Sequence, residues 1–378
     1  MKNLHLMPMN STFDDDAVLE LTELFPDVEN LFLHAAPRKA LAGFPNSIVV
    51  PEAFTPEYIN DHAAAYDQIF LHSLFLTPAE ILRLSDEAAR KITWCVWGHD
   101  LYTVPHPKKR DARQLLHEGI HAVKKLLRGT YIRQHRQMRS AAQKVSSFRR
   151  IAIGYPYDER MIRQKYGPKV PVVYGPYFSR TTEANIGRLR QMHLDRKDST
   201  VNILIGHCGF PFLEHEKYLR LLTAYRDEDI RIHLILSYGA SEQRIAELTA
   251  LAHSLFGPEK CEIITEMMPK VAYYEYLTHM DVAIFPFRHQ SALGNTMRLA
   301  YMGVKMYFDP RGVLAKGFLE GGVQTWDCRQ IGRIPFEQFC AEVVPPDIHA
   351  PLFNEFHYQK NIAAWGSIVR DSIKESMI

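Results

Sequence analysis

The densest group of polar side chains in the sequence follows an apolar run at 282–285 and leads into a helical pattern at 297–302. Arg288 supplies a cation in this group, and the free amides at the start of a helix attract anions. A departing nucleoside diphosphate needs both when no metal ion neutralises it. A capped helix after an ordinary loop would explain fewer of these residues. We therefore predict a phosphate-binding loop that contains Arg288, Gln290, Gly294, Asn295 and Thr296.

Glycines and polar residues also follow two other apolar runs. One run ends in a glycine turn with Gly206, His207 and Gly209, and Glu214 opens the next helical pattern. Glycine lets the backbone approach a ligand closely, and a helix start attracts anions. Glu266 follows the other run and would suit contact with a base or a ribose. Each of these motifs is also compatible with an ordinary tight connection, so they gain meaning only as a set.

A second kind of chemistry is offered by the aromatic motif W-C-V-W-G-H-D-L-Y at 94–102. Tryptophan and tyrosine rings stack on sugar faces, and a carboxylate or an imidazole can accept a hydroxyl proton. Asp100 in this motif is our first candidate for a general base. The alternatives are His99 beside it and His72, which directly follows an apolar run. A core pair of tryptophans beside a surface turn would explain the same motif.

These candidate residues stand where apolar runs end, and the runs alternate with longer helical patterns. Such alternation is typical of an α/β fold with parallel sheets, whose ligands bind beyond the carboxyl ends of the strands. We expect a first series of strands at 30–34, 47–50, 68–71, 92–96, 150–153 and 170–173. After a polar run, we expect a second series at 201–205, 230–236, 261–264, 282–285 and 304–308.

The length of 378 residues exceeds what one hydrophobic core usually supports, so we expect two Rossmann-like, doubly wound domains. We place them at 1–190 and 200–350, followed by a helix at 351–378 that crosses back to the first domain. The five cysteines form no C-x-x-C motif or zinc-like cluster, which indicates free thiols in a reducing compartment. We expect neither a signal peptide nor a membrane-spanning segment, because no apolar run is long enough.

The net charge is only +2, but positive charge is concentrated in one segment. Between residues 106 and 150, thirteen lysine and arginine residues stand against Asp111 and Glu118, which gives this segment a charge of +11. Aliphatic residues recur there near helical spacing. A basic amphipathic helix suits an anionic membrane surface, where each basic residue contributes about 1 kcal/mol. A solvated helix face is the alternative, and no nucleic-acid-binding motif accompanies the segment.

In their order along the chain, these motifs resemble glycosyltransferase family 56. Its members are TDP-N-acetylfucosamine:lipid II N-acetylfucosaminyltransferases, which extend a polyprenyl-linked oligosaccharide on the inner membrane of bacteria. The resemblance covers residues 70–312 and is strongest in the last third of the chain. It rests on Trp97-Gly98-His99-Asp100-Leu101-Tyr102, on Gly206 and Gly209 with Glu214-His215, on Tyr273, Leu277 and Asp281, and on Arg288, Gln290, Gly294 and Asn295.

The resemblance implies a GT-B fold, with two domains that face each other across a cleft. It implies a TDP- or GDP-linked sugar donor on the second domain, a polyprenyl-diphosphate-linked glycan acceptor on the first, and no metal or other cofactor. It also adds Tyr238 and Gly239 to the donor-site candidates, because an altered form of the family's Pro-x-Gly-Tyr motif stands there. The family's usual Gly-Asn-Ser is replaced by Gly206-His207-Cys208, which leaves the donor sugar open.

Together these observations predict a glycosyltransferase of bacterial surface polysaccharide synthesis that moves a deoxy or amino sugar, such as N-acetylfucosamine or fucose. An acceptor hydroxyl would attack the anomeric carbon while Arg288 and the helix start balance the charge of the departing diphosphate. An inverting reaction needs a general base and a retaining one does not, and the sequence is compatible with both. The alternatives are a non-catalytic module that binds sugars or lipid phosphates and a double-Rossmann nucleotide-sugar epimerase. We expect the protein in the cytoplasm, peripheral to the inner face of the plasma membrane.

Overall fold

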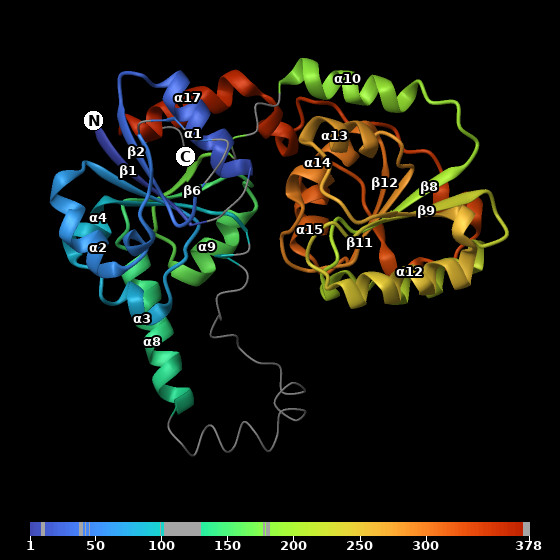
Figure 1. The fold of residues 1–378 in the computed structure, drawn as a ribbon, viewed down its shortest axis with the longest axis horizontal. Helices are drawn as coiled ribbons and strands as arrows, with labels where there is room; N and C mark the ends of the chain where they lie inside the picture. The colour runs from blue at the N-terminus through green and yellow to red at the C-terminus, as the bar shows by residue number, and fades with distance from the viewer. Residues whose placement is uncertain are drawn as a thin grey trace. The chain divides into compact units, whose positions relative to one another are not determined.

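The computed structural model describes residues 1–8, 12–37, 41, 43–44, 46–98, 100–101, 130–176, 178 and 182–372. They form two compact units, one of Met1–Arg180 with Gln359–Ile378 and one of Thr181–Tyr358. Each unit contains a parallel β-sheet with helices on both faces (Figure 1). The predicted α/β fold with two Rossmann-like sheets is thus confirmed.

The sheet of the first unit has the strand order β3-β2-β1-β4-β5-β6-β7. The order reverses between β1 and β4, and in such folds this reversal marks the usual place for a ligand. The strands are β1 (Lys2–Met7), β2 (Glu29–His34), β3 (Ser47–Val49), β4 (Gln68–His72), β5 (Ile92–Cys95), β6 (Arg150–Ile153) and β7 (Val172–Tyr174).

The two faces of this sheet carry different residues because side chains alternate along each strand. Leu4, Leu6 and Leu71 pack against one group of helices, whereas Phe32 and Phe70 pack against α1 and α17 on the opposite face. The first group is α2 (Pro56–His62), α3 (Pro78–Ile81), α4 (Asp86–Lys91), α8 (Thr130–Val145) and α9 (Asp158–Tyr166). The second is α1 (Thr12–Leu24) and α17 (Tyr358–Val369).

The last turn of α17 is tied to the first sheet by polar side chains. Asn3 Nδ2 donates to the carbonyl of Val369 at 3.0 Å, and Gln68 Nε2 donates to the carbonyl of Ile368 at 3.1 Å. Arg150 donates to the Ile368 carbonyl as well. The last carbonyls of a helix have no partner within it, so these side chains satisfy them. The C-terminal helix is therefore an integral part of the first unit.

The sheet of the second unit has the order β10-β9-β8-β11-β12-β13 and reverses between β8 and β11. Its strands are β8 (Val201–Ile205), β9 (Ile230–Ile235), β10 (Cys261–Ile264), β11 (Val282–Phe285), β12 (Lys305–Phe308) and β13 (Trp326–Asp327). Its helices are α10 (Glu183–Leu194), α11 (His215–Leu222), α12 (Glu242–Phe256), α13 (Lys270–Leu277), α14 (Leu293–Met302), α15 (Val313–Glu320) and α16 (Phe336–Cys340).

Three features differ from the expectation. The strands β1 and β13 were not expected. The domain boundary expected at residue 190 falls inside α10, which packs on α13 and α14 of the second unit; Arg188, for example, pairs with Glu275 at 2.8 Å. The pattern at 351–378 comprises a 3-10 helix at Pro351–Phe356, in the second unit, and then α17.

Most of the basic segment predicted at 106–150 lies outside the described residues. The described part includes α8, where Arg136 and Arg139 are exposed and Lys144 pairs with Asp86. Within the described ranges of the chain, no helix is long and apolar enough to cross a membrane.

Candidate functional site

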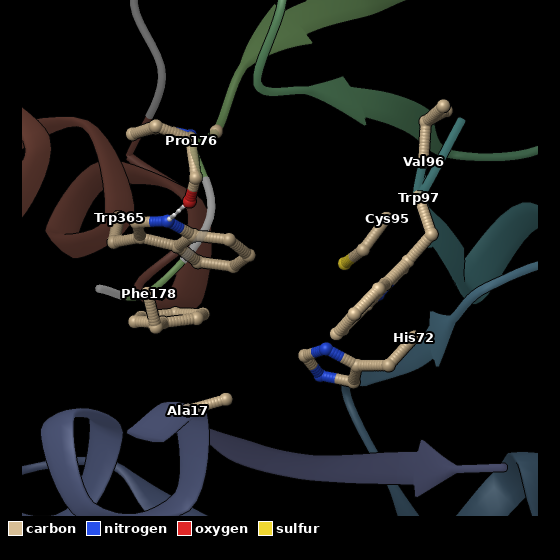
Figure 2. A pocket seen from close by; sticks show the side chains of 9 residues that line it. Ala17, His72, Cys95, Val96, Trp97, Pro176, Phe178 and Trp365 are labelled. Carbon is tan, nitrogen blue, oxygen red and sulfur yellow. Dashed lines mark hydrogen bonds between the residues drawn. The ribbon is translucent and has the colours of Figure 1, made fainter. Parts of the chain in front are cut away.

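A small pocket opens in the first unit where β4, β5 and β7 end. Its walls are largely aromatic and aliphatic, with His72 as the side chain that has the clearest capacity for proton transfer. In Figure 2 the rings of Trp365 and Phe178 lie close together on one side of the pocket, and His72 lies on the other. The lining residues are Ala17, His72, Cys95, Val96, Trp97, Gly175, Pro176, Phe178 and Trp365.

His72 is the last residue of β4 and is almost fully buried. Its Nε2 lies 3.0 Å from Nδ1 of His5 on the neighbouring strand β1. Burial, together with the nearby His5 and His34, lowers the pKa of His72 well below its ordinary value. The ring is therefore neutral near pH 7, with one of its two nitrogens unprotonated.

The backbone directly after His72 is strained. Ser73 has φ of 92°, in the left-handed region that a residue with a side chain seldom adopts. Its amide donates to the carbonyl of Cys95 at 3.0 Å, which holds the end of β4 against the end of β5. Such strain persists only where surrounding contacts enforce it, and it is found preferentially at functional sites.

Asp100 enforces this geometry. Its Oδ2 accepts hydrogen bonds from the Leu74 amide at 2.8 Å and the Trp94 indole at 2.7 Å. Its Oδ1 accepts from the amides of Trp97 and Leu101, both at 3.0 Å. The carboxylate is buried and accepts four hydrogen bonds, so its geometry does not suit the general base that we predicted. It positions the loops that carry His72 and Trp97 instead.

His99, the other base candidate, lies outside the described residues. Trp97 lines the pocket as the stacking hypothesis requires, whereas Trp94 is fully buried and contacts Tyr166 edge-on at 5.5 Å. The two tryptophans of the motif therefore have different roles, one at the pocket and one in the core.

In the second unit, the loops after β8 and β9 meet closely. Gly206 has φ of +71°, and the Gly209 amide donates to the Tyr238 carbonyl at 2.7 Å. A Cβ atom at Gly209 would lie 2.3 Å from the Cβ of Ala240, so only glycine fits. Gly239, with φ of +79°, likewise leaves room for the ring of Phe210. Sequence candidates from two separate motifs are thus brought together here.

His207 connects these loops to the loop after β11. Its Nε2 lies 3.2 Å from the hydroxyl of Ser291, and its ring lies 6.3 Å from the ring of Tyr238 and 6.0 Å from that of Phe287. Burial lowers the pKa of His207 to about 3, so this ring is neutral. Tyr238 is 44% exposed, and its ring contacts those of His207 and Phe210 edge-on.

Arg288 is held at the end of β11 by a carboxylate that follows β12. Its Nε donates to Oδ2 of Asp309 at 2.8 Å, and Arg311 donates to both oxygens of the same carboxylate. The two guanidinium groups hold the pKa of Asp309 far below its usual range. Both arginine side chains are more than half exposed, so the cluster presents a net positive charge to solvent. It suits binding of a phosphate.

The start of α14 differs in part from our expectation. The helix begins at Leu293, so Asn295 and Thr296 lie in its first turn rather than before it. Thr296 is fully buried and its hydroxyl donates to the Ala292 and Leu293 carbonyls, which corrects its predicted role as a ligand group. Asn295 Nδ2 donates to the Tyr273 hydroxyl at 2.8 Å.

The surroundings of this helix start are tightly packed. Gly294 accepts from Arg298 through its carbonyl, and an added Cβ would lie 3.0 Å from that guanidinium. Gln290 precedes the helix and is buried. Because the first amides of a helix have no partner within it, the backbone of α14 still offers donors to an anion.

Two predicted residues are not brought into this group. Glu214 is the N-cap residue of α11 and has a left-handed backbone conformation. Its side chain pairs with Lys217 at 2.8 Å on the surface. Glu266 is exposed after the edge strand β10, which is separated from β8 by β9. Neither makes a hydrogen bond to the other candidates among the described residues.

Sequence reasoning missed Asp309, Arg311 and His5. The two residues of the cluster could have been found, because Asp309 directly follows the strand that we expected at 304–308. His5 lies inside a strand, where no strand-end signal exists. Within the described ranges, no group of three or more His, Cys, Asp or Glu residues is arranged to hold a metal ion.

The comparisons with known proteins bear on the family and the fold. Residues 161–323 match the family described as 4-alpha-L-fucosyltransferase glycosyl transferase group 56. All the predicted donor-site residues lie inside that range. The resemblance stated from the motifs is thus confirmed over this part of the chain.

Solved structures extend the likeness in fold to the whole chain. A glycosyltransferase from Rickettsia africae is 11% identical, with a TM-score of 0.63 and 99% coverage of both chains. HepE of Anabaena, solved with UDP and glucose, is 13% identical, with a TM-score of 0.58 and coverage of 98% of this chain and 100% of that one. WaaG, a glycosyltransferase of lipopolysaccharide biosynthesis, is 10% identical, with a TM-score of 0.52 and 98% coverage of both. The fold is that of GT-B glycosyltransferases.

Proposed function

We propose that this chain, a glycosyltransferase with the GT-B fold, transfers a deoxy or amino sugar, such as fucose or N-acetylfucosamine, from a TDP- or GDP-linked donor. The acceptor is a glycan, which we propose to be linked to a polyprenyl diphosphate in bacterial surface polysaccharide synthesis. The observation that carries this proposal is the match to the fucosyltransferase family over the residues that contain Arg288 and the loops after β8 and β9.

In this proposal the second unit binds the donor. Arg288 and the first amides of α14 bind the diphosphate. The Arg288 side chain follows β11 and is exposed, and the start of α14 carries the positive end of the helix dipole. The loops at Gly206–Gly209 and Tyr238–Gly239 contact the rest of the donor, and their glycines allow the two loops to pack closely against each other beside it. We invoke no metal ion, because the arginines and the start of α14 together offset charge that develops on the leaving group.

The first unit binds the acceptor in the pocket of Figure 2. Trp97 stacks on the acceptor, the buried Trp365 forms part of the pocket wall, and His72 replaces Asp100 as the proposed general base. The acceptor oxygen forms a bond to the anomeric carbon, and the bond from that carbon to the diphosphate oxygen breaks. The acceptor proton moves to Nδ1 of His72, and the nucleoside diphosphate leaves. This is an inverting displacement.

The protein would meet such an acceptor at the cytoplasmic face of the membrane. The charge of +11 between residues 106 and 150 supports attachment to anionic lipid, and the exposed Arg136 and Arg139 belong to that segment. Peripheral attachment would keep a polyprenyl-linked acceptor near the enzyme.

The test is a panel of TDP-, GDP- and UDP-linked sugars incubated with the full chain and a polyprenyl-diphosphate-linked glycan. Mass spectrometry measures the mass added to the acceptor, and a thermal-shift assay measures stabilisation by each nucleotide. We expect one deoxy or amino sugar to be added, with TDP or GDP stabilising the protein more than UDP does.

The other outcomes identify the alternatives. Nucleotide binding without any gain in acceptor mass would contradict enzymatic transfer and favour a binding module. Conversion of the donor sugar in the absence of acceptor would favour an epimerase. Transfer of glucose from UDP-glucose would keep the reaction but overturn the donor assignment.

A further inference from the structure

A chain of buried hydrogen bonds runs from the last turn of α17 to His72. The carbonyl of Val369 accepts from Asn3 Nδ2 at 3.0 Å, and Asn3 Nδ2 also donates to Asn30 Oδ1 at 3.2 Å. Asn30 Oδ1 lies 3.0 Å from His5 Nε2, and His5 Nδ1 lies 3.0 Å from His72 Nε2. The chain crosses β1, β2 and β4 before it reaches the pocket.

The donor and the acceptor of each hydrogen bond can be assigned by starting from the Val369 carbonyl. A backbone carbonyl can only accept, so the Asn3 atom beside Val369 is the amide nitrogen. Asn30 must then present its oxygen to Asn3, and its own Nδ2 faces the Val28 carbonyl, which agrees with this orientation. That oxygen accepts from Nε2 of His5, so the proton of His5 is on Nε2.

The same logic fixes the proton of His72. Burial lowers the pKa of His5 to about 3, so its ring carries one proton, and its Nδ1 is an acceptor. Nε2 of His72 must donate to that atom. The single proton of neutral His72 is therefore on Nε2, and its Nδ1 carries a lone pair.

The position of His5 is as firmly determined as its protonation. The ring is fully buried between Phe32 and Phe70, with centroid distances of 4.7 Å and 4.4 Å. These two residues lie beside His5 in the register of the neighbouring strands. The ring of His5 therefore has little freedom to rotate away from His72.

We propose that His5 is a positioning residue for the transfer reaction, because it fixes His72 in the tautomer that presents an Nδ1 lone pair to the acceptor pocket. Asn30 and Asn3 fix His5 in turn, and the C-terminal helix supplies the carbonyl that orients the whole series of hydrogen bonds. The inference rests on the proposed function, in which His72 accepts the hydroxyl proton. When it does so, Nε2 keeps its proton and still donates to His5, which stabilises the imidazolium.

The tautomer can be measured without any activity. Ring-nitrogen NMR of the full chain, labelled with ¹⁵N-histidine at pH 7.5, separates protonated from bare nitrogens, and the spectrum of His72→Asn assigns the signals of His72. We expect a protonated Nε2 and a bare Nδ1. A proton on Nδ1 in the unmutated protein would overturn the proposal.

Kinetics then test the consequence. His5→Phe keeps the stacking between Phe32 and Phe70 but removes the acceptor for His72. We expect kcat to fall by about 10-fold or more, with the 10²–10⁴-fold typical of losing a general base as the upper limit, and KM for the donor to stay unchanged. The matched control is His233→Phe, which removes a buried neutral histidine from the second unit and should leave kcat unchanged. Equal loss of kcat in both variants, or none in His5→Phe, would contradict the proposal.

The two proposals fail in different ways. If the tautomer is as expected but His72→Asn transfers sugar at the normal rate, the general-base assignment fails. If His72→Asn loses transfer but the proton of His72 lies on Nδ1, the positioning role of His5 fails and the general-base assignment stands.

Discussion

Both units bury a neutral histidine that is oriented by an asparagine, but the two hydrogen-bond chains end differently. In the second unit, Asn202 Nδ2 donates to the Thr200 carbonyl at 3.1 Å, so its Oδ1 accepts from His233 Nε2 at 2.9 Å. The Tyr276 hydroxyl then donates to His233 Nδ1 at 2.6 Å and closes the chain. In the first unit, the series of hydrogen bonds continues from His5 to His72, and among the described residues no tyrosine bonds to the remaining nitrogen of His72.

Comparing His5 with His233 separates features that come with burial from the one that bears on the proposed reaction. Burial lowers the pKa of both His5 and His233 to about 3, and both lie on strands that are paired on both sides. A perturbed pKa and a fixed tautomer therefore accompany packing as readily as catalysis. The distinguishing feature of the first unit is that its chain ends on a residue that lines a pocket, beside the strained backbone of Ser73.

The largest effect that we expect is a difference in stability between variants of the two buried carboxylates, Asp100 and Asp309. Asp100→Ala would leave several buried donors unsatisfied, at about 1–3 kcal/mol each, and should strongly destabilise the first unit. Asp309→Ala frees arginines that water can solvate, so its cost should be much smaller. Urea unfolding followed by hydrogen exchange in peptides of each unit measures both. An Asp100→Ala protein that unfolds normally but has lost kcat would restore Asp100 as the general base.

The next effect concerns the donor and should be confined to the second unit. Arg288→Ala removes a charge-assisted contact of about 1.5–3 kcal/mol, so we expect donor affinity to fall roughly 10- to 100-fold. Arg329→Ala is the matched control, because Arg329 is a similarly exposed arginine paired with a carboxylate, that of Asp327. Calorimetric titration with TDP and GDP measures the dissociation constants. Equal affinity in both variants would remove Arg288 from the donor site.

A smaller effect appears in the pH dependence of stability. The folded-state pKa values of about 3 for His5, His207 and His233 and about 4 for His215 lie below the ordinary value of 6.5. The unfolded chain therefore binds the extra protons first, and stability falls as the pH falls below about 6.5. Each histidine contributes about 1.4 kcal/mol per pH unit in that window.

Three of those four histidines belong to the second unit, so its unfolding should depend more steeply on pH between 6.5 and 5. His233→Phe should reduce that slope by one proton, and His5→Phe should do so in the first unit only. Urea unfolding at pH 7, 6 and 5, followed separately in each unit, measures the slopes. A free energy of unfolding that is constant over this range would contradict burial of these rings in the neutral state.

The smallest effect concerns the membrane, where only the first unit carries the basic segment. Arg139→Ala in α8 should weaken binding to phosphatidylglycerol vesicles by about 1 kcal/mol, or roughly fivefold, at low salt. Gln143→Ala, at an exposed neutral position of the same helix, should change nothing. Co-sedimentation measures binding, which should weaken as salt shortens the Debye length to about 8 Å. Equal binding to neutral vesicles would argue against an electrostatic attachment.

The sequence predicted most of the fold because most strands are uninterrupted apolar runs. The strands β8, β10 and β11 begin and end where the pattern predicts. The strand β1 was missed because Asn3 and His5 interrupt its apolar residues, and polar side chains inside a buried strand contradict the usual pattern. The same two residues belong to the hydrogen bonds that orient His72. The strand β1, which was not predicted, therefore contains the residues of the proposed positioning role.

The site was predictable only where residues follow strands. Arg288 and the glycine turn at Gly206 stand at strand ends, and there the rule for parallel sheets applies. Asp100 could not be recognised as structural, because its partners Leu74 and Trp97 come from loops whose meeting depends on the pairing of β4 with β5. The sequence identifies the chemistry of a side chain, whereas its hydrogen-bond partners can be identified only once the pairing of the strands is known.

The central claim is that the first unit supplies the base and the second binds the donor. The most direct test is one variant, His72→Asn, measured for donor affinity by calorimetry and for sugar transfer to the polyprenyl-linked acceptor. We expect an unchanged dissociation constant for the nucleotide and a fall in kcat of roughly 10²-fold or more. Normal transfer, or a loss of donor affinity as large as the loss of transfer, would contradict this division of roles.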